Sequence, residues 1–155
     1  EFAKRSWIGF AMIFIIGDAV EIYLDAADNK NHREANPRTL CEFHEGDHHF
    51  WAVPIPEENR AYLGQWKSWE EIPQTIFDIP NVQSGAKTID GGYVMEFLIP
   101  AAMIKNYQPE SGKIGFNANI VVKGQRFERE VYWFRPKNWA TNNWPMMWGT
   151  MILEK

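Results

Sequence analysis

Two indoles and two amides lie close together near the C-terminal end of the chain, at Trp139, Asn142, Asn143 and Trp144. A ligand such as a sugar presents C–H groups on its ring faces and hydroxyls around its rim. An aromatic ring can stack on the face while planar amides bond the rim, which is the general design of a small-ligand site. Residues 138–145 have the composition of a loop, where binding residues concentrate. The stretch therefore predicts a ligand site.

A second group of potential ligands lies between His44 and His49, which holds three of the four histidines together with Glu45 and Asp47. Two histidines of like parity across a tight turn suit zinc or copper. The segment supplies no complete tetrahedral set, and exposed polarity around a hairpin turn is the other interpretation.

Signatures of catalysis are absent from the sequence. It has no Gly-x-Ser-x-Gly elbow, no His-Glu-x-x-His motif and no phosphate-binding glycine loop. The carboxylate pairs Glu70/Glu71 and Glu128/Glu130 lie in polar sequence, with nothing apolar nearby to raise a pKa for glycoside hydrolysis. We therefore predict that this chain is not an enzyme.

Composition limits the other classes of function. A chain of 155 residues is long enough for one domain with a real core, and its net charge of −4 argues against a nucleic-acid partner. Eight Trp residues are unusual, and because Trp is seldom buried completely we expect several to be partly exposed. The single Cys41 excludes a disulfide within the domain and is expected to be a buried, inert thiol.

The elements that must position these residues are short strands. In residues 17–25, Val20, Ile22 and Leu24 alternate with Glu21, Tyr23 and Asp25, so we expect one set in a core and the other in solvent. Further strands are predicted at residues 86–89, 93–99, 114–122 and 130–134, with one short helix at residues 100–104. We interpret residues 54–80 as an irregular excursion with one helical turn. The pattern predicts an all-β fold, an antiparallel β-sandwich of jelly-roll or immunoglobulin-like type with one short helix.

The first sixteen residues allow two interpretations. Lys4 and Arg5 precede an apolar run, Trp7 to Ile16, which imitates a signal peptide. Cleavage after it would cut into the strand that follows, so we interpret the run as a buried strand. It is too short to span a membrane, and no membrane span is expected.

Several of these segments, taken in order, resemble the family 9 carbohydrate-binding modules, which are accessory sugar-binding domains of secreted polysaccharide-degrading enzymes. The similar segments are Gly17–Asp25, Asp47–Trp51, Gly92–Pro100, Ile114–Asn119 and Pro145–Leu153, so the resemblance covers most of the chain from Gly17 onward. It implies that residues 1–155 form a single carbohydrate-binding-module-like domain, to which the family normally adds further N-terminal residues. It also implies a noncatalytic module for a polysaccharide or oligosaccharide such as cellulose or xylan. Such a module would belong to a larger secreted or surface protein, hence an extracellular or cell-surface location.

The resemblance also implies which residues bind the sugar. The family's C-terminal binding tryptophan corresponds to Trp144, with Asn142 or Asn143 close before it; the alternative is that Trp144 plugs the end of the sandwich. The family's other polar contacts correspond to Glu21 and Asn119. The chain departs from the family at Ile15, where the first stacking Trp is expected, and at Trp51, where an Arg is expected. A second stacking ring is therefore sought at Trp51, or at Trp66 and Trp69, and Trp139 completes the predicted set.

The family commonly holds structural calcium, which needs oxygen ligands from several loops. Asp25 and Asp28 are the candidate calcium ligands here, and an ordinary polar turn is the alternative. Two other functions stay open. One is a structural or interaction domain of a cell-surface protein. The other is a b-type haem-binding relative of the same sandwich, with Met146, Met147, Met151 or a histidine as axial ligand.

Overall fold

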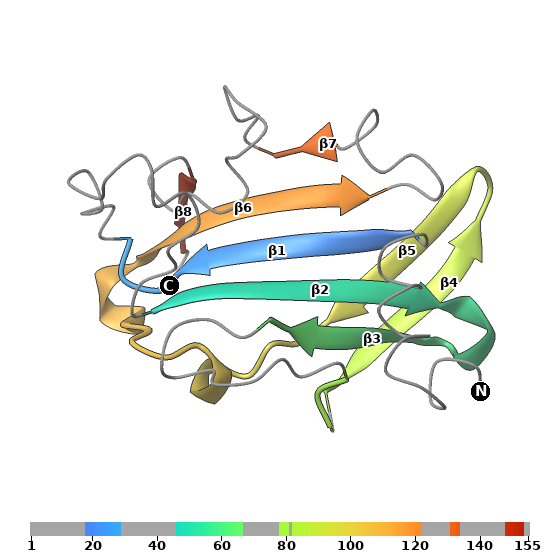
Figure 1. The fold of residues 1–155 in the computed structure, drawn as a ribbon, viewed down its shortest axis with the longest axis horizontal. Coiled ribbons are helices and arrows are strands. Elements are labelled where there is room, and N and C mark those ends of the chain that lie inside the picture. Colours follow the sequence, from blue (N-terminus) through green and yellow to red (C-terminus); the bar gives the residue numbers. More distant parts are fainter. Residues whose placement is uncertain are drawn as a thin grey trace.

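Two antiparallel sheets form the molecule in the computed structural model, which describes residues 18–28, 46–66, 78–80, 82–121, 131–133 and 148–153. The larger sheet has six strands in the order β3-β2-β1-β6-β7, and β8 also pairs with β6 (Figure 1). Its strands are β1 (Ala19–Asp25), β2 (Asp47–Ile55), β3 (Arg60–Gln65), β6 (Lys113–Val121), β7 (Val131–Tyr132) and β8 (Gly149–Ile152). The smaller sheet pairs β4 (Ser84–Ile89) with β5 (Gly92–Phe97).

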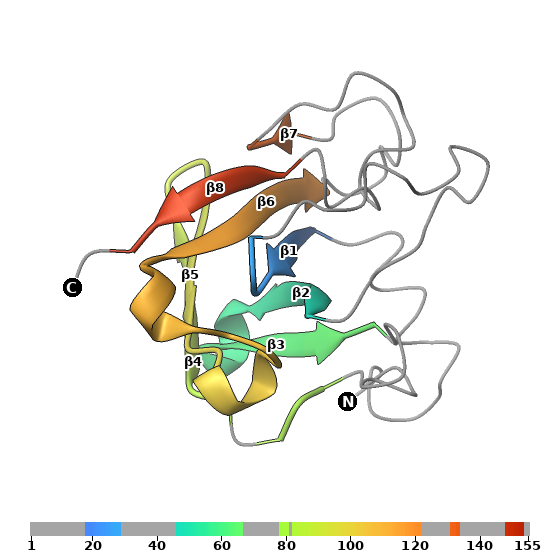
Figure 2. The same cartoon turned by 90° about the vertical axis from the view of Figure 1, so that its left-hand side faces the viewer.

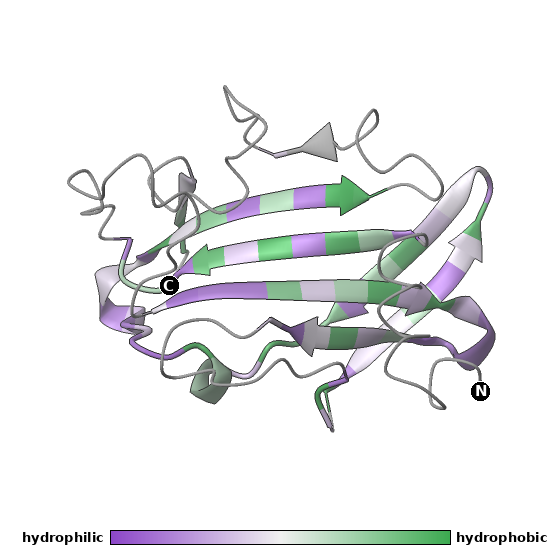
Figure 3. Cartoon of the chain, in the orientation of Figure 1, coloured by the Kyte–Doolittle hydropathy of each residue, from purple (hydrophilic) through white to green (hydrophobic). Residues whose placement is uncertain are grey.

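The strand β1 is central because it pairs with β2 on one side and β6 on the other. Its alternating residues have the period of two that places neighbours on opposite faces of a sheet, and the same alternation of hydropathy is visible along β1 and β6 in Figure 3. Val20, Ile22 and Leu24 face the smaller sheet, and Glu21, Tyr23 and Asp25 face away from it. The predicted division of this strand into two faces is therefore confirmed.

The hairpin β4–β5 forms the second layer and crosses one face of the larger sheet (Figure 2). Its two strands pair from Ser84–Phe97 to Ile89–Gly92, which leaves Asp90 and Gly91 as the turn. Gly91 has a φ of 76°, a backbone conformation that glycine adopts without steric cost. Met95 and Phe97 point toward the larger sheet, and Val94 and Glu96 point outward.

The main core lies between the two sheets. Ile22, Leu24, Phe50, Leu63 and Ile114 are buried there, and most of the partly buried side chains packed on them come from β5 and from the segment after it. Such interdigitating apolar faces are what join two sheets into a sandwich. The predicted all-β antiparallel sandwich is confirmed.

The expected excursion at residues 54–80 was wrong in its first part, because β2 extends to Ile55 and β3 follows after a 3₁₀ turn at Pro56–Glu58. Pro54 favoured a loop in the sequence. In the structure Pro54 lies beyond Ala52, the last β2 residue that pairs with β1, so among the described residues β2 is an edge there and tolerates a proline. The predicted helical turn is this 3₁₀ turn.

The short helix predicted near residues 100–104 is a 3₁₀ turn at Ala101–Met103, and a second 3₁₀ turn follows at Pro109–Ser111. The predicted strand within residues 1–16 and Cys41 lie outside the described residues. Within the described part of the chain, no helix has the length and apolar character needed to cross a membrane.

Candidate functional site

Three residues that the resemblance singled out lie side by side across three strands of the larger sheet. Glu21 of β1 is the register partner of Trp51 on β2 and of Asn119 on β6. Register partners have side chains on the same face, so the three form one row, on the face turned away from the β4–β5 hairpin. We call this face the polar face. It also carries Tyr23 and His49, which lie two residues from Glu21 and Trp51 respectively.

The Glu21 carboxylate is the hydrogen-bonding centre of the row. Its Oε2 atom accepts a hydrogen bond of 2.7 Å from the Tyr23 hydroxyl and one of 2.9 Å from Nδ2 of Asn119. The Glu21 side chain is 12% exposed. Burial raises the pKa of this carboxyl above its ordinary value, although the two hydrogen bonds oppose the shift. The site therefore holds a carboxylate that has lost most of its hydration.

Beside Glu21 lies His49, which stacks on the Tyr23 ring with centroids 4.3 Å apart. Its Nε2 atom is 3.8 Å from Oε1 of Glu21. Burial lowers the pKa of His49 to about 3, so the imidazole is neutral at pH 7 and this contact is not an ion pair there. The sequence predicts for His49 only a metal ligand or an exposed hairpin residue, although its position two residues from Trp51 places it on the same face of the strand.

The tryptophan of the row is packed tightly. Trp51 is 1% exposed, and its ring lies so close to its register partner Gly64 that a Cβ atom at Gly64 would overlap it. The partly buried Trp66 meets the same ring at a centroid distance of 4.9 Å. Stacking of a sugar on Trp51 stays a prediction, and Trp66 is the more exposed of these two indoles.

Another tryptophan, Trp148, contacts the Tyr23 ring at 5.4 Å and is buried. Its position on the closing strand, directly before Gly149, favours packing over ligand contact, and its burial agrees with that interpretation. It packs on the polar face, away from the core between the sheets.

The expectation that the Glu21 face meets solvent was wrong. Tyr23, Asp25, Asn117 and Asn119 are all nearly inaccessible, and a second apolar cluster around Trp51, Val53 and Tyr62 lies on the same face. Buried polar groups need hydrogen-bond partners, and Glu21, Tyr23 and Asn119 supply them to one another. Alternation in the sequence reports which residues share a face, but it does not report whether that face is covered.

The two candidate calcium ligands have different surroundings. Asp25 is buried at the end of β1 opposite Asp47 and accepts a hydrogen bond from the Ala27 backbone N–H. Asp28 accepts a hydrogen bond from the Thr150 hydroxyl and lies 3.4 Å from Nζ of Lys113. In the described ranges no group of three or more His, Cys, Asp or Glu side chains is placed to hold a metal ion. The calcium site stays a prediction.

His48 and His49 do not form the exposed turn that the sequence favoured, because both are buried on opposite faces of β2. His48 lies on the core side, where Nδ1 is 3.0 Å from Nε2 of Gln65 and Nε2 is 3.4 Å from the Lys105 carbonyl oxygen. These contacts join β2 to β3 and to Lys105, which follows the 3₁₀ turn at Ala101–Met103. The arrangement fits a structural histidine.

Trp139, Asn142, Asn143 and Trp144 lie outside the described residues, as do Met146 and Met147. The residues on either side of this stretch are described. Tyr132 pairs with Asn119, and Gly149 pairs with Phe116 on the same strand β6. Both ends of the stretch therefore start from β6, about 10 Å apart at ~3.3 Å per strand residue, and one of them starts at Asn119 in the candidate row.

The fold and this row of residues belong to an all-β domain with a polar, aromatic-lined sheet face. The chain matches the model of the carbohydrate family 9 binding domain-like family over residues 16–155, and it therefore belongs to that family of carbohydrate-binding domains. Such module families are typically noncatalytic. No curated protein and no solved structure gives a significant match to the chain.

Proposed function

We propose that this chain is a noncatalytic module that binds a polysaccharide or oligosaccharide on the polar face of its larger sheet. The observation that carries the proposal is the row formed by Trp51, Glu21 and Asn119, in which the Glu21 carboxylate is fixed by Tyr23 and Asn119. A carboxylate and an amide held in place by neighbouring side chains bond sugar hydroxyls without further ordering, which favours affinity.

The stacking ring in this proposal is Trp144, with Asn142 or Asn143 bonding the ligand beside it and Trp139 on the same stretch. The support is the position of the strands that flank the stretch, because β7 ends beside Asn119 and β8 begins opposite Phe116. A stretch of fourteen residues, 134–147, joins Trp133 to Trp148. It is long enough to reach back over the Glu21 row, at up to about 3.3 Å per extended residue.

Cellulose and xylan are the glycans that we propose first, and a secreted or surface protein is the proposed parent, because these are what the family resemblance implies. Structural calcium through Asp25 is part of the same proposal. Asp28 would have to release Lys113 and Thr150 to join it.

The test is a glycan array followed by calorimetry, with Trp144→Ala compared with the unchanged protein. Aromatic stacking on a flat partner is worth about 1–3 kcal/mol, judged by stacking on nucleic-acid bases. The variant should therefore bind roughly tenfold more weakly or worse, since ~1.4 kcal/mol is a factor of ten. Its thermal midpoint should stay close to that of the unchanged protein.

Several results would contradict the proposal or one of its parts. Unchanged affinity with a collapsed midpoint would make Trp144 a packing residue, and failure to bind any glycan would favour a structural or interaction domain. An absorbance scan of the purified protein tests the haem-binding alternative, because bound haem would give a Soret band. Release of reducing sugar from cellulose, xylan or mannan by the purified chain would contradict the noncatalytic assignment.

A further inference from the structure

The charge of Glu21 has no cationic neighbour in the part of the molecule that the structure describes. The Lys and Arg residues there are Arg60, Lys87, Lys105 and Lys113. Arg60 pairs with Asp78, and Lys113 pairs with Asp28. Lys87 belongs to the smaller sheet. His49, whose Nε2 atom is 3.8 Å from Oε1 of Glu21, is kept neutral by burial.

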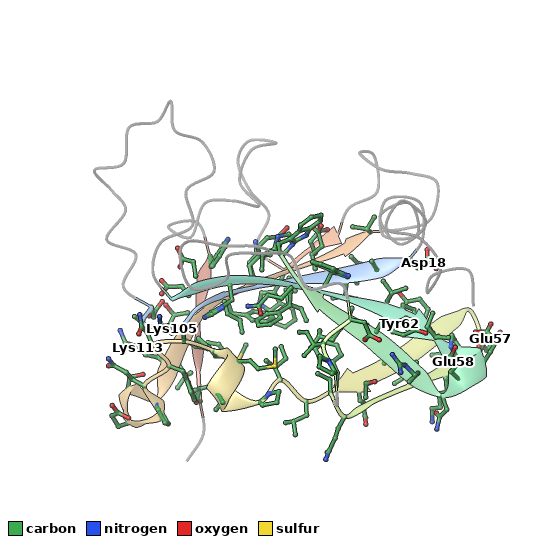
Figure 4. The ribbon with its side chains drawn as sticks, turned by 60° about the horizontal axis from the view of Figure 1, so that its bottom comes forward. Asp18, Glu57, Glu58, Tyr62, Lys105 and Lys113 are labelled. Atoms are coloured by element: carbon green, nitrogen blue, oxygen red, sulfur yellow. The ribbon has the colours of Figure 1, made fainter. Side chains whose placement is uncertain are left out.

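Lys105 and Lys113 lie at the end of the molecule opposite to the start of β1. Figure 4 shows Lys105 and Lys113 together at one end, with Asp18 and Glu57 at the opposite end. Glu21 lies three residues from Asp18 and pairs with Asn119, which is six residues along β6 from Lys113. At ~3.3 Å per strand residue the Lys113 backbone is about 20 Å away from the row. Over that distance salt screens most of the attraction, since the Debye length is about 8 Å in physiological salt.

Two acceptor oxygens at the site make no hydrogen bond to a described residue. Both hydrogen bonds to Glu21 end on Oε2, and Oε1 lies 3.8 Å from Nε2 of His49. Asn119 is 0% exposed and uses its Nδ2 to donate to Glu21, and its Oδ1 has no hydrogen-bond partner among the described residues. A buried acceptor without a partner is costly, so this oxygen calls for a donor from a ligand.

An ammonium group is a ligand group that matches this carboxylate well. Its charge is opposite to that of Glu21, and it can donate three hydrogen bonds to the acceptor oxygens of the row. The partly buried indole of Trp66, which contacts Trp51, adds a ring face that attracts cations. We propose that the site prefers amino sugars, with the ammonium of a 2-amino-2-deoxy sugar placed between Oε1 of Glu21 and Oδ1 of Asn119. This inference rests on the proposed function and specifies its ligand class.

The test compares sugars that share one ring and differ at C2. The probes are glucosamine, glucose and N-acetylglucosamine, and then the β-1,4-linked oligosaccharides of each, which carry an ammonium, a hydroxyl or an acetamide at that carbon. Affinities are measured by calorimetry at physiological salt, because a protein of net charge −4 attracts any polycation at low salt. We expect the ammonium sugars to bind about tenfold or more tightly, as for a charge-assisted hydrogen bond in a site with little water.

The dependence on pH gives a second signature that needs no variant. Affinity for the ammonium sugar should fall at acid pH as Glu21 takes up a proton, and should fall again at alkaline pH as the amine loses one. Affinity for the hydroxyl sugar should not show this bell shape.

A pair of variants then assigns the effect to Glu21. Glu21→Gln keeps the size of the side chain and removes its charge, so the ratio of affinities for ammonium and hydroxyl sugars should fall to about one. Glu96→Gln removes an exposed carboxylate from β5 on the other sheet and should leave the ratio unchanged.

Equal affinities for the ammonium and hydroxyl sugars at every pH would overturn the amino-sugar inference and leave the proposed function standing. Absence of binding to every sugar would overturn the proposed function as well. A preference that is lost equally in both variants would show a nonspecific charge effect and would also overturn the inference.

Discussion

The two faces of the larger sheet can be compared residue by residue, because they alternate along the same strands. On the face toward the β4–β5 hairpin, Ile22, Phe50 and Leu63 pack against the apolar side of the second sheet. On the polar face, Glu21, Asn119 and Tyr23 are joined by hydrogen bonds. Both faces are buried, yet the first needs only shape and volume, whereas the second needs every polar group to be satisfied.

This difference shows where a ligand is to be sought. An apolar core that is well packed has no capacity left for binding. The polar face retains two unused acceptors, Oε1 of Glu21 and Oδ1 of Asn119, within the described part of the chain. Burial alone therefore does not distinguish a packing face from a candidate binding face. The acceptors that make no hydrogen bond to a described residue do.

The largest effect is expected on the apolar face. Phe50 is completely buried in the main core, so Phe50→Ala should lower the free energy of unfolding by about 3–5 kcal/mol through lost burial and a cavity. Ile89→Ala, on an exposed side chain of the β4–β5 hairpin, is the control and should change it by less than about 0.5 kcal/mol. Chemical denaturation measures both. Similar losses in the two variants would contradict the assignment of the core.

A smaller effect is expected where the polar face is packed most tightly. Gly64→Ala places a methyl group in the Trp51 ring, and overpacking of this kind costs about 1–3 kcal/mol. Because Trp51 lies beside Glu21, the same variant should also weaken glycan binding. Gly85→Ala is the matched control, since a Cβ there meets nothing within 4 Å and the residue is likewise in a strand. Equal stability of the two variants would mean that Trp51 can move aside freely.

A third effect depends on pH and concerns two groups of the polar face, His49 and Glu21. The pKa of His49 is about 3 in the folded protein and 6.5 when unperturbed, so between these values the unfolded chain binds a proton that the folded chain does not. The unfolding free energy should therefore fall as pH drops below 6.5, by up to about 1.4 kcal/mol per unit, and should be independent of this group above 6.5. Glu21 acts with the opposite sign, because its raised pKa favours proton uptake by the folded state.

His49→Gln should flatten this loss of stability in acid, and Glu21→Gln should steepen it. Denaturation curves at several pH values between 4 and 7 measure both slopes. An unchanged slope in His49→Gln would show that His49 is protonated in the folded protein.

Much of this architecture could be predicted from the residues. Period-two alternation located β1, β5 and β6, and it placed Glu21 on the face opposite Val20 and Ile22. The strand β3 was missed because Pro54 and Pro56 flank the point where β2 ends, and proline usually marks a loop. Of the candidate site, Glu21, Asn119 and Trp51 were named through a family resemblance, whereas His49 and Tyr23 were not recognised as their neighbours.

The sequence by itself determined which side chains share a face of each strand, because that depends only on the alternation of the extended backbone. The tertiary structure decided which strands are neighbours and in which register they pair. A shift of one residue between β1 and β6 would have turned Asn119 away from Glu21. It also decided that the Glu21 face is buried, and hence that its carboxylate has a raised pKa and that His49 is neutral. Burial and electrostatics arise from residues far apart in the chain, and no local pattern specifies them.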